Sequence, residues 1–233
     1  MSRLKGEGAV VHGVRGRNAG PDHRPRVARE RRGRTRARIL ETALAVFAEK
    51  GPDAPRIDDF IRAAGIARGT FYNYYRSTDE LLRAATHALE DGLIASIEAE
   101  LEPLDDPLDR LAGGILLWLG KAHDDPLWCR FVVRVRSRAA GVERELGNDL
   151  RDAMKAGLIR SVDLRVARDL VVGTILEAMA RMIDERVPAR YARDVAQSIL
   201  LGLGAQRRRV EALVGAGPRD RAVHRRQARA RTR

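Results

Sequence analysis

Five polar side chains lie within residues 68–74, and all of them can donate hydrogen bonds to a nucleic acid. They are Arg68, Thr70, Tyr72, Asn73 and Tyr74. An arginine reaches a guanine edge in the major groove with two hydrogen bonds, and amides and hydroxyls reach other base edges. Tyrosine hydroxyls bond to phosphate oxygens, which fixes the register of a protein on the duplex without reading its sequence. The chemistry predicted for this stretch is recognition of double-stranded DNA.

Two short helices are predicted to position these side chains. Apolar residues recur at helical spacing over residues 57–64, and Gly65 follows, where a helix ends in a left-handed residue. A second helix is predicted over about residues 68–75, with Phe71 and Tyr75 on its inner face. This is the pattern of a helix-turn-helix, whose second helix enters the major groove. The same pattern occurs in helical proteins that never touch DNA, so the pattern alone leaves that alternative open.

Longer helices are predicted on both sides of this pair. One covers about residues 35–49 and supports the pair through its apolar stripe. The other starts at Ser77, which with Glu80 fits a capping box, and continues to about Leu101. A helix of this length leaves the DNA-binding region and is a natural lever between two domains.

The motif around the short helices has a specific resemblance. The string Gly-Ile-x-x-Gly-Thr-Phe-Tyr-x-Tyr-Tyr starts at Gly65, and Ser-x-Asp-Glu-Leu-Leu starts at Ser77. Together they resemble the DNA-binding domain of the TetR family of one-component transcriptional regulators, over about residues 34–82. With the basic stretch that leads into the first helix, the residues predicted to contact DNA are Arg34, Arg36, Arg56, Arg68, Gly69, Thr70, Tyr72, Asn73, Tyr74 and Thr78.

Three positions depart from the pattern of that family. Arg56 stands where a threonine usually opens the second helix, and Thr78 stands where a lysine usually follows the serine. Ala67 replaces the usual serine cap of the third helix, so a cap worth about 1 kcal/mol is missing. These changes put individual phosphate contacts in doubt and leave the domain assignment unchanged.

Positive charge is concentrated at the two ends of the chain. The net charge is +12; residues 1–38 hold 12 Arg and Lys against 3 acids, and residues 207–233 hold 10 Arg against 2 acids. Residues 1–33 and 207–233 are therefore predicted to be disordered basic extensions. For residues 1–26 a solvated end, or sequence upstream of the true start, is the favoured interpretation. For residues 29–38 the favoured interpretation is contact with the DNA backbone or minor groove.

Residues 83–206 are predicted to form a larger helical domain. Strand signals are absent, which predicts an all-α chain of about nine helices. The string Asp-Leu-Arg-x-Ala-x-x-Ala-Gly-Leu-Ile-Arg over residues 149–160 resembles the C-terminal half of TetR-type regulators, whose last two helices pair between subunits. That resemblance implies a homodimer interface at Leu170, Val171, Thr174, Ile175, Ala178, Met182, Val195, Ile199 and Leu203. The alternative is that both helices pack inside one subunit.

An apolar helical domain of this kind is predicted to enclose a pocket for a small apolar effector. The candidate lining residues are Trp118, His123, Trp128, Cys129, Met154 and Glu177. For each of them, ordinary core packing is the competing interpretation. No cofactor is predicted.

Signals for catalysis, metals and membranes are missing from the sequence. The five histidines are scattered, and neither a Cys-x-x-Cys pair nor a phosphate loop is present. The single cysteine and the lack of a long apolar run favour a cytoplasmic protein that neither spans nor binds a membrane. The prediction is therefore a protein without enzymatic activity.

The combined prediction is a bacterial, homodimeric, ligand-responsive regulator of transcription, acting as a repressor that a small apolar molecule releases from its operator. A different class, a non-specific DNA-coating protein driven by its Arg-rich ends, stays open. So does an interaction module that has kept the fold without binding DNA.

Overall fold

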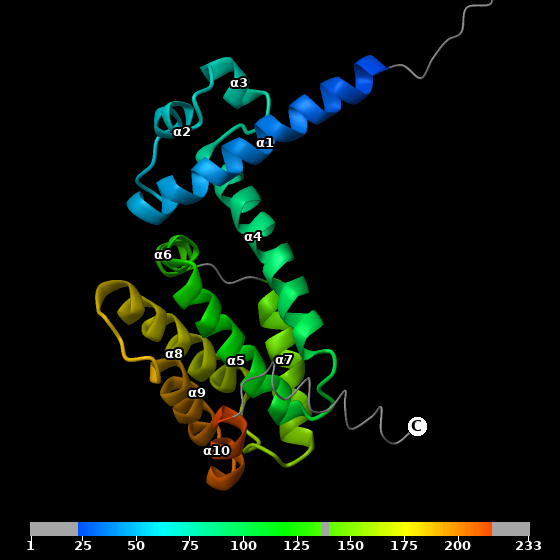
Figure 1. The fold of residues 1–233 in the computed structure, drawn as a ribbon, viewed down its shortest axis with the longest axis vertical. Coiled ribbons are helices and arrows are strands. Elements are labelled where there is room, and N and C mark those ends of the chain that lie inside the picture. Colours follow the sequence, from blue (N-terminus) through cyan, green and yellow to red (C-terminus); the bar gives the residue numbers. More distant parts are fainter. Residues whose placement is uncertain (1–22, 137–139, 216–233) are drawn as a thin grey trace, which may run out of the picture. The chain divides into compact units, whose positions relative to one another are not determined.

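The computed structural model describes residues 23–136 and 140–215, and every regular element in that part of the chain is a helix (Figure 1). The all-α prediction is confirmed. The ten helices are α1 (His23–Lys50), α2 (Ile57–Ala64), α3 (Arg68–Tyr72), α4 (Thr78–Leu101), α5 (Pro107–Asp124), α6 (Pro126–Val135), α7 (Ala140–Lys155), α8 (Leu164–Asp184), α9 (Tyr191–Gly202) and α10 (Arg207–Gly215). None of these helices is long and apolar enough to cross a bilayer.

The chain divides into two units, residues 1–36 and residues 37–233, and helix α1 spans the boundary between them. Residues 1–33 were predicted to be disordered. The structure corrects this for residues 23–33, which are helical because α1 begins at His23. Arginine and alanine are good helix formers, and an Arg26–Glu30 pair one turn apart supports the helix at 3.6 Å. Residues 1–22, the rest of the predicted N-terminal extension, lie outside the described residues.

Three aromatic rings hold α1, α2 and α3 together in the second unit. Phe47, Phe60 and Phe71 are fully buried, with ring centroids 4.9 Å apart for Phe47–Phe60 and 6.4 Å for Phe60–Phe71. Gly65 adopts the left-handed conformation (φ 60°) that ends α2, as its position in the sequence predicts. Helix α3 is therefore mounted on a rigid base in spite of its length.

Helix α3 is shorter than predicted, whereas α4 has the predicted extent. Residues 73–75 follow α3 as a turn, in which the amides of Tyr74 and Tyr75 both donate to the Phe71 carbonyl. The Ser77 hydroxyl accepts from the Glu80 amide at 3.2 Å and so caps α4. The Glu80 carboxylate accepts from the amide of Arg76 rather than that of Ser77.

Helix α5 is the centre of the C-terminal helices and contacts α4, α6, α7, α8, α9 and α10. Asp106 caps α5 and Asp125 caps α6, each followed by a proline that suits the first helical turn.

Helix α10 corrects a second prediction, because residues 207–215 were expected to be disordered. Its residues Val210, Leu213 and Val214 are buried, and Arg209 pairs with Asp106 at the start of α5. These apolar positions give a short arginine-rich segment enough buried surface to be ordered. Residues 216–233 lie outside the described residues.

Candidate nucleic-acid interface and effector cavity

The polar side chains predicted to read DNA lie together on α3 and the turn after it. Arg68, Gly69, Tyr72 and Asn73 are exposed, and Thr70 and Tyr74 are half-buried. The Phe71 ring, on the opposite side, is fully buried. One face of this element is therefore anchored, and the other presents a guanidinium, an amide and hydroxyl groups to solvent.

The Arg68 guanidinium is held by a partner on α2 that the sequence analysis missed. Its Nη1 donates to Oδ1 of Asp58 at 2.9 Å, and both side chains are more than half exposed. The hydrogen bond that Arg68 donates to the Tyr72 side chain and the charge of Asp58 raise the pKa of Arg68 above its usual value. Exposed ion pairs of this kind stabilise a fold by about 0–1 kcal/mol, so Arg68 can leave Asp58 for a base edge at small cost.

The three positions that depart from the family pattern lie around α2, α3 and α4. Arg56 is exposed at the start of α2, where its amide donates to the Asp59 carboxylate at 2.9 Å. Hydrogen bonds from Lys50 and from that amide lower the pKa of Asp59. Ala67 provides no side-chain cap to α3, as expected, and Thr78 is half-buried in the first turn of α4.

Arg34 and Arg36 are exposed on α1 and belong to the first unit. The described part of α1 up to residue 38 is rich in arginine, and Glu30 is its single acidic residue.

The C-terminal helices enclose a cavity with about 910 Å³ of empty space, counting the part open to solvent. Most of its lining is apolar and comes from α4, α5, α6, α7 and α8. The lining residues are Ile94, Ile97, Glu98, Leu101, Arg110, Leu111, Gly114, Ile115, Trp118, Val132, Glu145, Leu146, Asp149, Val171, Val172, Ile175 and Leu176.

Of the six candidate effector contacts, only Trp118 is among these lining residues. Its ring packs edge-on against the buried Trp128, with centroids 5.1 Å apart. Burial raises the pKa of the Cys129 thiol to about 11, which fits ordinary core packing. Met154 packs against the core, and His123 and Glu177 are exposed. The other five residues do not line this cavity, because an apolar helical pattern does not indicate which side of a helix faces a cavity.

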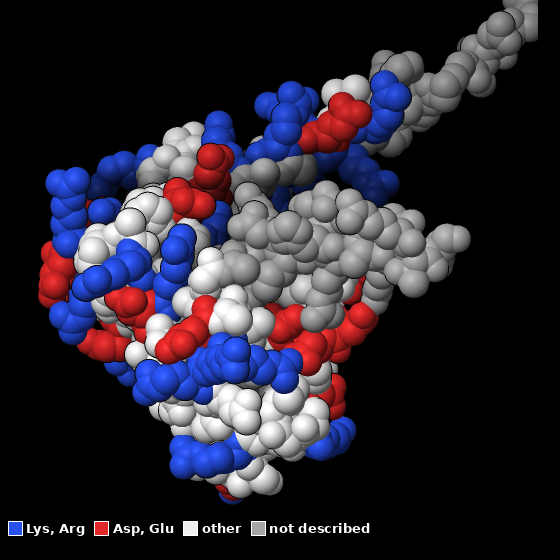
Figure 2. Space-filling view, turned by 60° about the horizontal axis from the view of Figure 1, so that its bottom comes forward, with Lys and Arg blue, Asp and Glu red and all other residues white. Residues whose placement is uncertain are grey.

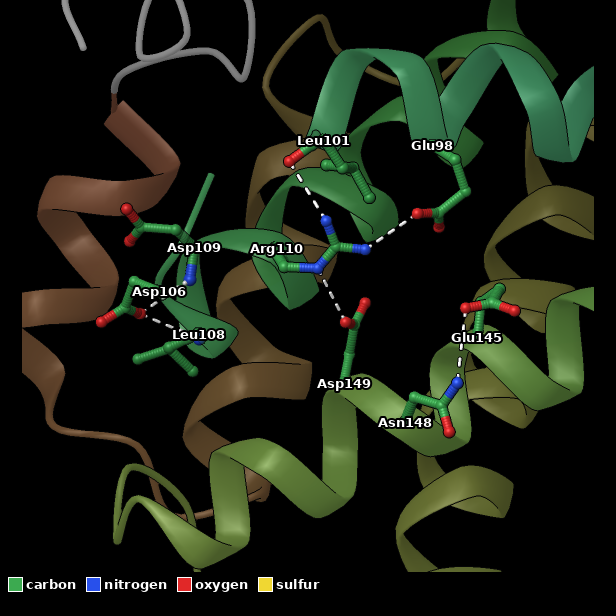
Figure 3. A network of polar contacts seen from close by, with 9 residues as sticks. All are labelled: Glu98, Leu101, Asp106, Leu108, Asp109, Arg110, Glu145, Asn148 and Asp149. Atoms are coloured by element: carbon green, nitrogen blue, oxygen red, sulfur yellow. Dashed lines mark hydrogen bonds and ion pairs between the residues drawn. The ribbon is translucent and has the colours of Figure 1, made fainter. Parts of the chain in front are cut away.

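A polar network lies in the cavity wall, and the sequence analysis missed it. Arg110 of α5 lies between Glu98 of α4 and Asp149 of α7, as Figure 3 shows. Its Nη2 donates to Glu98 and its Nε to Asp149, both at 2.9 Å, and its Nη1 donates to the Leu101 carbonyl at 3.1 Å. Burial lowers the pKa of Arg110, but its hydrogen bonds to the two carboxylates outweigh burial, so the pKa is raised overall. Burial also raises the pKa of the Asp149 carboxyl. In the sequence, this network was indicated only by the presence of charged residues on otherwise apolar helices.

The predicted dimer-interface residues fall into two groups. Five of them are buried within the subunit: Val171, Ile175, Ala178, Ile199 and Leu203. The other four remain accessible to different degrees: Leu170 is exposed, whereas Thr174, Met182 and Val195 are half-buried. Helix α8 is apolar on more than one side, so its spacing pattern does not separate the inner side from the outer side.

Comparison with known proteins gives the family of the N-terminal domain. Residues 39–85 match the model of the bacterial regulatory proteins of the tetR family. The transcriptional repressor KstR2 of Mycobacterium tuberculosis is 34% identical over 78 residues, which are 34% of this chain and 39% of that protein. The regulator YfiR of Bacillus subtilis is 36% identical over 70 residues, 30% of this chain and 34% of its own. The chain thus matches about two fifths or less of the length of these relatives.

Solved structures extend the likeness of fold beyond that domain. The structure of RolR with resorcinol matches 80% of this chain and 95% of the RolR chain, at 23% identity and a TM-score of 0.60. The structure of FadR of Bacillus subtilis with stearoyl-CoA matches 72% of this chain and 96% of the FadR chain, at 21% identity and a TM-score of 0.61. Residues 39–85 thus match the tetR-family model, and most of the chain shares the fold of these two solved structures.

Proposed function

We propose that this protein is a sequence-specific DNA-binding regulator, acting as a repressor that a small, largely apolar effector releases from its operator. The observation that carries the proposal is the exposed polar face of α3, mounted on the buried Phe47, Phe60 and Phe71 within a tetR-type domain. Arg68 and Asn73 are assigned to base edges, and Tyr72 and Tyr74 to phosphates. The relatives are named as transcriptional regulators, which agrees with a function in binding rather than catalysis.

The cavity is the proposed effector site, and two elements link it to the DNA-binding domain. Helix α4 begins after the helix-turn-helix and contributes Ile94, Ile97 and Leu101 to the cavity. Helix α6 contributes Val132, and its neighbour Phe131 contacts Phe47 of α1 with ring centroids 6.5 Å apart. By linkage, an effector that weakens DNA binding must itself be bound less tightly by the DNA complex.

The protein is proposed to act as a homodimer through α8 and α9. Val166 and Leu170 are exposed and lie four residues apart on α8, which places them on one side of that helix. Two subunits related by a two-fold axis would match the two half-sites of an operator. The arginines of the first part of α1 are proposed to contact the DNA backbone, which strengthens binding without adding sequence information. A cytoplasmic location stays a prediction.

A non-specific DNA-coating protein is the alternative, since the two ends of the chain are strongly basic. The face presented in Figure 2 gives it less support, because basic and acidic side chains are interspersed there. A coating protein would be expected to show a continuous basic surface.

Footprinting on the DNA upstream of the protein's own gene tests the two functions. The full chain is compared with a variant that lacks residues 1–36 and 216–233 but keeps α10, whose apolar residues are buried. A specific regulator retains a short protected site, and the truncation lowers its affinity and the salt dependence of binding. Loss of all protection on truncation, or uniform protection by the full chain, would establish the coating protein instead.

A further inference from the structure

The cavity has a chemically distinct region among its otherwise apolar walls. Four of its lining residues are charged: Glu98, Arg110, Glu145 and Asp149. Three carboxylates against one guanidinium leave this region with an excess of negative charge when all four are ionised. We call these four residues the acidic wall.

The guanidinium of the acidic wall is already engaged. Its three nitrogens donate to Asp149, Glu98 and the Leu101 carbonyl at 2.9–3.1 Å (Figure 3). An anionic ligand would have to displace a carboxylate from Arg110 and would then lie near all three acids. The acidic wall therefore disfavours carboxylates and phosphates in the cavity.

Glu145 is the carboxylate best able to receive a ligand. It is half-buried in the cavity wall, and the hydrogen bonds of Arg110 go to Asp149, Glu98 and the Leu101 carbonyl instead. Its contacts are long: 3.4 Å from Asn148 Nδ2 and 3.6 Å from Arg144 Nε, and the Arg144 side chain is 71% exposed. Partly buried carboxylates in this number are stabilised by a second positive charge that donates hydrogen bonds.

We propose that the effector is a cationic amphiphile, an apolar body that fills the cavity and a protonated amine that binds at Glu145, Glu98 and Asp149. The inference rests on the proposed function in taking this cavity as the effector site. It adds the class of head group, which the apolar lining alone does not specify. Gly114 of α5 contributes lining without a side chain, which leaves room for the apolar body.

Three probes with one apolar body and different head groups test this: 4-phenylbutylamine, 4-phenylbutan-1-ol and 4-phenylbutanoate. Their binding to the full chain without DNA is measured by calorimetry at pH 7. The amine is expected to bind about tenfold more tightly than the alcohol, the worth of one charge-assisted hydrogen bond, and the acid more weakly than both. Equal affinities, tightest binding by the acid, or no binding of the amine at millimolar concentration would each overturn the proposal.

Single substitutions test where the amine head group and the apolar body of the ligand bind. Glu145→Gln should remove most of the amine's advantage over the alcohol, whereas Glu102→Gln, at an exposed acid outside the cavity, should not. Gly114→Leu should weaken amine and alcohol alike by filling the cavity, and a Cβ there meets its nearest neighbour, in Leu101, at an ordinary 3.7 Å. Thermal unfolding checks that each variant is folded. If Glu145→Gln and Glu102→Gln bind the amine equally well, the acidic wall does not hold the head group.

A separate measurement distinguishes this inference from the proposed function. Operator release is followed with the same three probes once the footprint is known. Amine binding without release would refute the coupling and leave the head-group assignment standing. Release by all three probes at equal concentrations would support the regulator and refute the cationic effector.

Discussion

At the scale of residues, the DNA-binding face depends on a few side chains held in place by others. Phe71 buries one side of α3, and Asp58 and Tyr72 hold the Arg68 guanidinium above the other side. Asn73 follows on the exposed turn. Base-edge and phosphate contacts differ in what they contribute, so single substitutions separate them.

Arg68→Ala and Asn73→Ala are each expected to reduce discrimination between operator and random DNA by about 1–3 kcal/mol, the value of a lost base contact. Tyr74→Phe should weaken both kinds of site evenly, because it removes the hydroxyl assigned to a phosphate contact. Dissociation constants on both duplexes at one salt concentration measure the difference.

Asp58→Asn is the matched control for Arg68, since it breaks the same ion pair without removing the guanidinium. It should leave discrimination close to that of the unchanged protein. If Arg68→Ala and Asn73→Ala lower specific and random binding as evenly as Tyr74→Phe, the assignment of base-reading roles is wrong.

At the scale of elements, two helices are candidates for transmitting effector binding. Helix α4 runs from the Ser77 cap to the cavity wall at Leu101. Helix α6 places Val132 in the cavity wall and Phe131 against Phe47. The first route works through a continuous helix and the second through a packed aromatic contact.

Ala95→Pro is expected to abolish coupling between effector and operator, because proline removes a helical hydrogen bond and kinks α4. Ala95 is exposed, so the change removes no buried contact. Coupling is measured as the ratio of effector affinities with and without operator, for which 1–3 kcal/mol would be typical.

Phe131→Leu is the companion variant for the second route, chosen because it keeps an apolar side chain at a buried position. It should lower coupling only in part if α4 is the main transmitter. Should Ala95→Pro remain folded, dimeric and fully coupled while Phe131→Leu loses coupling, α6 is the transmitter and the role given to α4 is wrong.

At the scale of the whole molecule, the proposed binding to an operator with two half-sites would require two chains, one for each half-site. Val166 is 61% exposed and Leu170 39% exposed on α8. Large apolar side chains in one exposed row are costly in a monomer and are typical of an interface.

Val166→Asp is expected to give monomers at micromolar concentration and to abolish operator binding, because it places a charge in the proposed interface. Leu127→Asp is the control, since Leu127 is an equally apolar residue, 43% exposed, on α6. Sedimentation measures both. A Val166→Asp protein that stays dimeric would place the interface elsewhere.

The sequence by itself determined the features that depend on local interactions. Gly65 ends α2 in the left-handed conformation, Ser77 caps α4, and α3 buries Phe71 while Arg68 and Tyr72 are exposed. Each of these follows from residues within one or two helical turns of each other, which a spacing pattern records. The extent of α1 and the presence of α10 were not determined in this way, because their arginine-rich composition also suits a disordered chain.

Only the tertiary structure decided which apolar side of α8 faces the core and what lies in the cavity wall. Val171 and Ile175 were predicted to pair with a second chain, but they line the cavity of their own subunit. Arg110 meets Asp149 from a different helix, 39 residues away in the sequence. Helical spacing predicts that a residue is buried, but it does not predict which residues it packs against. Those partners are set by how helices far apart in the sequence pack together.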